Sequence, residues 1–215
     1  MKENTIEKFN DALADVRKAH RLIYSYQQRM LDLVYFIKTK FDFPEFVGVK
    51  HFSNPIANKR NGYQAIFNDM WAWDFLYSYV YEYHFGEIFL EDGSSCVLSV
   101  IQYSDTGYFE IEEENSHTDV NSFLSPEMSS SKCLFFLEIK FKAKDPWKSN
   151  FKDLIYDKKI ASMKHQRDVF RDKGHIQVLY SFPLDSFLNE KTTINALQEF
   201  VKYCSEEDVV DLKIV

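Results

Sequence analysis

The feature that most constrains this chain is an alternation of aromatic residues between positions 71 and 85. Every odd-numbered position there holds a ring: Trp71, Trp73, Phe75, Tyr77, Tyr79, Tyr81, Tyr83 and Phe85. So many large side chains must either be buried or bind a flat ligand. Strict alternation is typical of a strand with one aromatic face. However, a strand over all fifteen positions would be longer than the usual three to ten residues.

A helix is the alternative for the same segment. Asp74, Ser78 and Glu82 are spaced four residues apart and would form one polar stripe, with rings on the remaining faces. Gly86 would follow where a C-terminal cap glycine belongs. We therefore predict a buried helix over residues 64–85 in the middle of the core, and we keep the strand as the second interpretation.

The N-terminal segment predicts one long helix over residues 5–40, which no Pro or Gly interrupts. Apolar residues recur every seven positions at Phe9, Val16, Ile23, Met30 and Ile37. This spacing fits a coiled coil, in which His20 and Gln27 at the matching positions would set the register. Ala12, Ala19, Tyr26 and Leu33 widen the apolar stripe and favour packing onto the protein's own core. A homodimer through this helix stays open as the alternative.

The remainder of the chain predicts a mostly antiparallel sheet of four or five strands and a C-terminal helix. Strands are expected at 47–49, 87–90, 96–103, 108–113, 132–144, 175–182 and 209–215, and helices at 149–172 and 186–204. Ser104-Asp105-Thr106-Gly107 is expected to form a hairpin turn between two of these strands. The predicted fold class is α+β. We expect a single domain over 1–215, with 1–42 as the long helix and 64–204 as the core.

Cysteine usage and hydropathy indicate the surroundings of the protein. The three cysteines, Cys96, Cys133 and Cys204, form no CxxC pair, which is typical of free thiols in a reducing compartment. The first residues lack the apolar segment of a signal peptide. No apolar stretch reaches the ~20 residues that cross a bilayer. The sequence therefore predicts a soluble, cytoplasmic protein without membrane contact.

One pattern of residues has the composition of a catalytic site. Glu138 and Lys140 lie two positions apart on an expected strand, so their side chains should share one face. A carboxylate beside an ammonium group can bind Mg²⁺ and position a hydrolytic water. Asp105, at the edge of the preceding strand pair, would supply the second carboxylate. The plain alternative is a solvated strand face with an ordinary charge pair.

This order of elements, with its Asp and its Glu-x-Lys, resembles the core of the PD-(D/E)xK nuclease superfamily over roughly residues 64–182. The resemblance implies that Asp105 and Glu138 hold a Mg²⁺ ion, with Glu82 as a further ligand, and that Lys140 activates the water. It also implies a helix that carries Gln166 and Phe170. A basic block fits such an activity, because residues 132–173 hold twelve basic and six acidic side chains, a sum of +6, in a chain of net charge −7.

Three functions stay open, and the sequence does not decide whether the chain is an enzyme. The favoured one is an interaction module without chemistry, for which a homodimer through the N-terminal helix stays open. The second is a Mg²⁺-dependent nuclease that uses Asp105, Glu138 and Lys140. The third is a small-ligand binder whose pocket is lined by aromatic residues: Trp71, Trp73, Tyr77 and Tyr81.

Overall fold

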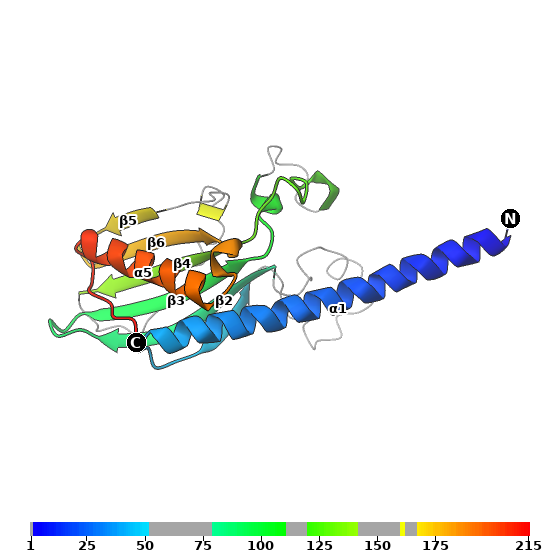
Figure 1. Cartoon of the computed structure of the whole chain (residues 1–215). Helices are drawn as coiled ribbons and strands as arrows, with labels where there is room; N and C mark the ends of the chain where they lie inside the picture. The colour runs from blue at the N-terminus through cyan, green and yellow to red at the C-terminus, as the bar shows by residue number, and fades with distance from the viewer. Residues whose placement is uncertain (1, 52–78, 111–119, 142–159, 162–166) are drawn as a thin grey trace, which may run out of the picture. The chain divides into compact units, whose positions relative to one another are not determined.

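The computed structural model describes residues 2–51, 79–110, 120–141, 160–161 and 167–215 (Figure 1). Within it the chain divides into two compact units, Met1–Phe36 and Ile37–Val215. Each unit is described by itself. None of the described helices is both long and apolar enough to cross a bilayer.

The first unit consists of helix α1, Lys2–Lys40, whose last turn belongs to the second unit. The predicted helix over 5–40 is therefore confirmed. Lys38 and Lys40 lie in the last turn, where cations interact favourably with the negative end of the helix dipole. The helix ends just before Phe43-Pro44, because proline disfavours helical geometry in the residue that precedes it.

The second unit is built on a six-stranded sheet in the order β1-β2-β3-β4-β6-β5. Every neighbouring pair is antiparallel. The α+β class and the antiparallel sheet are confirmed, with one strand more than the upper prediction. The strands are β1 Val47–His51, β2 Val80–Phe89, β3 Ser95–Tyr103, β4 Lys132–Lys140, β5 Arg167–Arg171 and β6 His175–Pro183.

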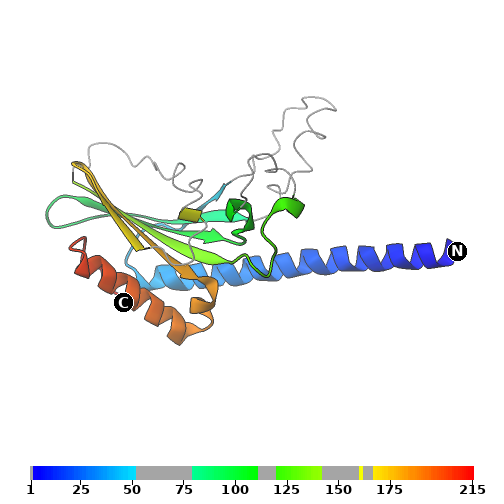
Figure 2. The ribbon, with the colours of Figure 1, turned by 90° about the horizontal axis from the view of Figure 1, so that it is seen from above.

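Helix α5, Glu190–Glu206, covers one face of this sheet (Figure 2). It begins at Asn189, whose side chain accepts a hydrogen bond from the backbone of Thr192, and the Thr192 hydroxyl closes the reciprocal bond of a capping box. Its Phe200 packs 5.0 Å from the ring of Phe135 on β4 and 6.0 Å from that of Tyr180 on β6, measured between centroids. The predicted amphipathic helix over 186–204 is confirmed in type and starts four residues later.

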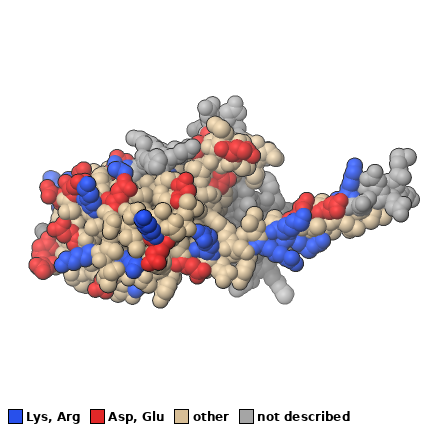
Figure 3. All heavy atoms as spheres, viewed as in Figure 1, with Lys and Arg blue, Asp and Glu red and all other residues tan. Residues whose placement is uncertain are grey.

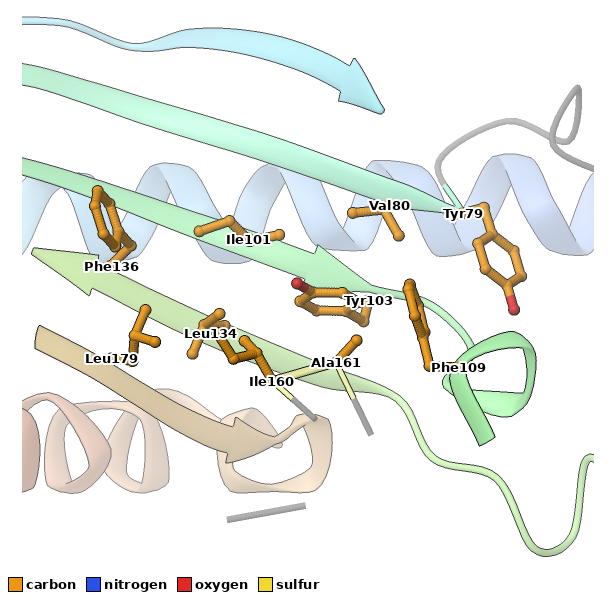
Figure 4. Packing of buried hydrophobic residues seen from close by; sticks show 10 residues of the cluster. All are labelled: Tyr79, Val80, Ile101, Tyr103, Phe109, Leu134, Phe136, Ile160, Ala161 and Leu179. Atoms are coloured by element: carbon orange, nitrogen blue, oxygen red, sulfur yellow. The ribbon is translucent and has the colours of Figure 1, made fainter. Parts of the chain in front are cut away.

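The opposite face carries a core cluster at one end of the sheet (Figure 4). Tyr103 at the end of β3 meets Phe109 edge to face at 5.6 Å between ring centroids. Ile160 and Ala161 cover this end and are almost fully buried. The cluster comprises Tyr79, Val80, Ile101, Tyr103, Phe109, Leu134, Phe136, Ile160, Ala161 and Leu179.

The prediction of a helix over 64–85 is wrong where the structure tests it. Residues 80–85 belong to strand β2, so the alternation was a strand signal there, while residues 64–78 lie outside the described residues. Gly86 is not a helix cap. It has φ of +92° inside β2, where the register with β3 shifts between His84 and Glu87. A bulge with a glycine at positive φ bends the strand without the steric cost that a side chain would add.

Four other expected elements differ from the structure. Gly107–Glu110 is a 3₁₀ helix and not a returning strand, because it turns Phe109 into the core cluster. The end of the predicted helix 149–172 is strand β5, which forms by pairing with β6. Residues 160–161 are helical, and residues 149–159 and 162–166 lie outside the described residues. Residues 209–215 have no regular structure, although Val215 N–H donates to the Lys40 carbonyl at 3.0 Å. Strand β4 ends at Lys140 and not at residue 144.

Candidate functional site

Asp105 and Glu138 lie at opposite ends of the β3–β4 pair. Tyr103 pairs with Lys132, whereas Glu138 pairs with Val97, six residues back along β3. Six residues span about 20 Å of strand. Thr106 N–H donates to the Ser130 carbonyl, so the chain after β3 continues away from Glu138. One metal ion with ligand bonds of ~2.1 Å cannot bridge these carboxylates. The prediction that Asp105 and Glu138 share one metal ion is therefore wrong.

Asp105 has a local role in the turn that follows β3. Its Oδ1 accepts a hydrogen bond from the backbone N–H of Gly107 at 2.8 Å. The neighbouring Thr106 hydroxyl donates to Glu110 Oε1 at 2.8 Å. Asp commonly bonds its own backbone two residues ahead in this way, and the bond fixes a turn.

Glu138 and Lys140 do share a sheet face and form an ion pair, with 3.6 Å between Lys140 Nζ and Glu138 Oε2. Glu138 is only 5% exposed, so the interpretation of this carboxylate as part of a solvated strand face is wrong. Its other oxygen accepts a hydrogen bond from Gln177 Nε2 at 2.9 Å. The pair is thus a partly desolvated charge pair in the sheet, with its acceptors occupied by neighbouring side chains.

Glu82 lies on strand β2 and not on a helix, and it belongs to a row of four hydrogen-bonded polar side chains, of which three are buried and His84 is half-buried. Its Oε1 accepts from the Ser99 hydroxyl at 3.0 Å, and its Oε2 lies 3.1 Å from His51 Nε2. His84 Nδ1 lies 3.0 Å from the same Ser99 oxygen. Burial lowers the pKa of His84, and the carboxylate of Glu82 partly opposes that effect.

The hydrogen-bonded row of His51, Glu82, Ser99 and His84 lacks the arrangement of a catalytic serine and its base. A nucleophilic serine donates its proton to the histidine that serves as its base. Here the Ser99 hydroxyl donates to Glu82 and is fully buried. These side-chain hydrogen bonds therefore join β1, β2 and β3 on one face of the sheet and give the buried polar groups their partners.

The predicted ligand set is not assembled by the sheet. Glu82 pairs with Ile101 and Glu138 with Val97, on strands two apart. Four residues along the strand and two strand spacings across place their Cα atoms about 16 Å apart. Among the described residues, no group of three or more His, Cys, Asp or Glu side chains is placed to hold a metal ion.

The described residues of the aromatic segment are buried or half-buried. Tyr83 and Phe85 are at most 1% exposed, which confirms core packing for these two rings. Tyr81 is half-buried and its ring lies against Gly48 on β1. Phe170 lies on strand β5. Four residues of the binder and nuclease hypotheses, Trp71, Trp73, Tyr77 and Gln166, lie outside the described residues.

Lys132 is a buried cation that the sequence analysis missed. It is 1% exposed, and its Nζ donates to the Ile160 carbonyl at 2.8 Å and lies 5.0 Å from the centre of the Tyr103 ring. Burial lowers the pKa of Lys132 to about 7, and the nearby Glu110 partly opposes this. The sequence did carry a signal for this burial. Lys132 lies two and four positions before Leu134 and Phe136, so its side chain is expected on the same face of the strand as these two apolar residues.

The three cysteines are free and buried. Burial raises the pKa of the Cys133 and Cys204 thiols to about 12, and it raises the pKa of Cys96 further. A thiol reacts as its thiolate, so burial disfavours reaction of these side chains in the folded protein.

A row of exposed apolar side chains at heptad spacing lies on α1. Ile6 and Phe9 are each 63% exposed, and Val16 is 52% exposed. From Gln27 on, the same heptad positions are buried, with Met30 at 2% and Val34 at 0%. We call the exposed part the N-terminal stripe, which consists of Ile6, Phe9, Leu13, Val16 and Ile23.

One protein-family model matches the chain over residues 6–209. The chain belongs to the PM0109 family. No curated protein and no solved structure matches it. The range matched by the PM0109 family begins at Ile6, the first residue of the N-terminal stripe, and contains all six strands and α5. The stripe and the sheet are therefore both parts of the family's common region.

Proposed function

We propose that this PM0109 family member is an interaction module that self-associates through the N-terminal stripe of α1. The observation that supports it is the exposure of five large apolar side chains at heptad spacing on one helix. A helix in water normally buries its apolar stripe, and contiguous exposed apolar surface on a soluble protein marks an interaction site. The buried, free thiols fit a reducing compartment, and we place the protein in the cytoplasm.

The second copy is the partner that fits this surface. A two-fold dimer uses the same patch on both subunits, so the patch must be complementary to itself. Side chains that repeat every 3.5 residues on average can pack into the spaces between identical side chains of a second helix. The stripe ends at Ile23, because the next heptad positions, Gln27 and Met30, are already buried.

The expected affinity is modest. Fully burying one apolar side chain contributes roughly 1.5–3 kcal/mol, and about half of each stripe residue is already covered by its own helix. Ten such side chains in two copies therefore contribute on the order of 10 kcal/mol. Lost translational and rotational freedom opposes this by roughly 4 kcal/mol or more. The balance corresponds to a dissociation constant in the micromolar range or weaker.

Sedimentation velocity of the full chain across the micromolar range tests the proposal. We expect the mass to rise with concentration from monomer to dimer. Leu13→Asp should keep the chain monomeric throughout, because it places a charge in the middle of the stripe. Ser25→Asp is the matched control, since Ser25 is exposed on α1 away from the stripe, and it should dimerise like the unmodified chain.

Two outcomes would contradict the proposal. One is an unmodified chain that remains monomeric at every concentration. The other is a dimer that Leu13→Asp leaves intact. Circular dichroism of all three proteins should be the same, because both substituted positions are exposed in the monomer.

A further inference from the structure

We infer that the two α1 helices pair antiparallel, with the two-fold axis between Ala14 and Asp15. This inference rests on the proposed self-association and specifies its geometry. The exposed heptad positions run from Ile6 to Ile23. An antiparallel pair that uses this whole length has its centre midway between those two residues. Each residue of one helix then faces the residue of the other whose number brings the sum of the two to 29.

Layer volumes favour this direction. The facing residues would be Ile6 with Ile23, Phe9 with His20, and Leu13 with Val16, each layer occurring twice. Every layer then combines side chains of complementary or similar size, which fills the space between helices evenly. A parallel pair would instead place two Phe9 rings in one layer and two Val16 side chains in the next layer but one.

The position of His20 points the same way. His20 is exposed and occupies a heptad position that faces the partner. In a parallel pair the two His20 rings would meet each other, with two polar groups in one apolar layer. In the antiparallel pair each His20 ring faces Phe9 of the other copy, and an aromatic ring is the better partner for an imidazole.

Charge and side-chain size along the helix add to this preference. Residues 7–15 hold three acidic residues and one basic residue, whereas residues 17–21 hold Arg17, Lys18 and Arg21. Figure 3 shows charged side chains of both signs on α1, with basic ones gathered towards its middle. Antiparallel pairing sets residues 17–21 of each copy beside residues 8–12 of the other, which hold one basic and one acidic residue. Parallel pairing would instead bring the two basic segments together within about a Debye length. Ala12 and Ala19 would flank the seam in each copy, where small side chains allow close approach.

Single engineered cysteines distinguish the two directions. The native cysteines are buried and do not interfere. Phe9→Cys and His20→Cys, made in the full chain with tags of different mass, are oxidised alone and as a mixture. We expect a disulfide dimer from the mixture, composed of one chain of each kind, and none from either variant alone. Ser25→Cys, which lies away from the stripe, is the control and should not cross-link.

Each other outcome overturns the inference in a recognisable way. Dimers from Phe9→Cys alone and from His20→Cys alone indicate parallel helices, and the proposed self-association would stand. The absence of any cross-link in a chain that sediments as a dimer places the interface elsewhere. A chain that sediments as a monomer overturns the inference and the proposed function together.

Discussion

Replacement of Lys132 by methionine should stabilise the protein at neutral pH and destabilise it in alkali. In the folded chain the ammonium group is almost completely buried, so the pKa of Lys132 falls from 10.5 to about 7. At 1.36 kcal/mol per pH unit, this fall corresponds to an upper bound of roughly 5 kcal/mol of folding free energy lost at low pH. Methionine removes this loss. It also leaves the buried Ile160 carbonyl without the Lys132 donor, which costs about 1–3 kcal/mol.

The sign of the pH dependence follows from proton binding. The pKa of Lys132 is depressed in the folded state, so between about pH 7 and pH 10.5 the unfolded chain binds the proton and the folded chain does not. Stability rises with pH wherever the unfolded state binds more protons. The contribution of Lys132 therefore improves as the pH rises through this window and is constant below it. From pH 7 to pH 8.5 the gain amounts to about 2 kcal/mol.

Urea unfolding at pH 6, 7 and 8.5 measures this effect as a difference between two proteins. The buried thiols lose stability as the pH rises through their unfolded pKa, because their folded pKa is raised, but they do so equally in both proteins. We expect Lys132→Met to be the more stable protein at pH 6 and 7, by about 1–3 kcal/mol. Its advantage should shrink by about 2 kcal/mol at pH 8.5. Lys202→Met, at an exposed position on α5, should show no such trend. A difference between Lys132→Met and the unmodified chain that does not vary with pH would refute the reasoning.

Three further predictions concern the sheet, the C-terminal helix and the thiols. Gly48→Ala should lower the free energy of unfolding by about 1–3 kcal/mol, because the added methyl group would overlap the ring of Tyr81; urea unfolding that shows no loss would contradict this contact. Asn189→Ala should lower the melting temperature, since loss of an N-cap costs about 1 kcal/mol, whereas Asn189→Asp should keep most of the stability and serves as the control. Cys133 and the other two thiols should react with a disulfide reagent only after urea is added; rapid reaction in the folded protein would contradict their burial.

The elements that the sequence predicted well carry their signal within one segment. Helix α1 has an uninterrupted apolar stripe, and α5 has an apolar face that begins at a capping residue. Strands β3, β4 and β6 are mostly apolar segments of nine residues each, bounded by turn residues. In each of these segments the local preference of the backbone and the burial of side chains favour the same structure.

The elements that were missed depend on their neighbours. Residues 80–85 satisfy both a helical and an extended pattern, and pairing with β1 and β3 on either side selects the strand. Strand β5 has a weak pattern of its own and forms because β6 offers an edge. Phe109 packs against Tyr103 in the core cluster, and residues Gly107–Glu110 form a 3₁₀ helix in place of the predicted strand.

The candidate site shows the same division between local and long-range information. The alternation along β4 correctly predicted that Glu138 and Lys140 share a face. It did not predict where Asp105 lies relative to them. Because β4 runs antiparallel to β3, each residue of β4 after Lys132 pairs with a residue nearer the start of β3. Glu138 therefore lies six residues along the strands from the end of β3, where Asp105 follows.

By itself the sequence determined the long helix, the apolar stripe along it, the antiparallel class of the sheet and the state of the thiols. These properties follow from the order of apolar and polar residues along single segments. Only the tertiary structure decided that the heptad positions of α1 are exposed before Gln27 and buried from Gln27 on, that Lys132 lies in an apolar interior, and that the Asp105 and Glu138 carboxylates lie far apart. Burial and distance are set by residues remote in the sequence, so no pattern within one segment contains them.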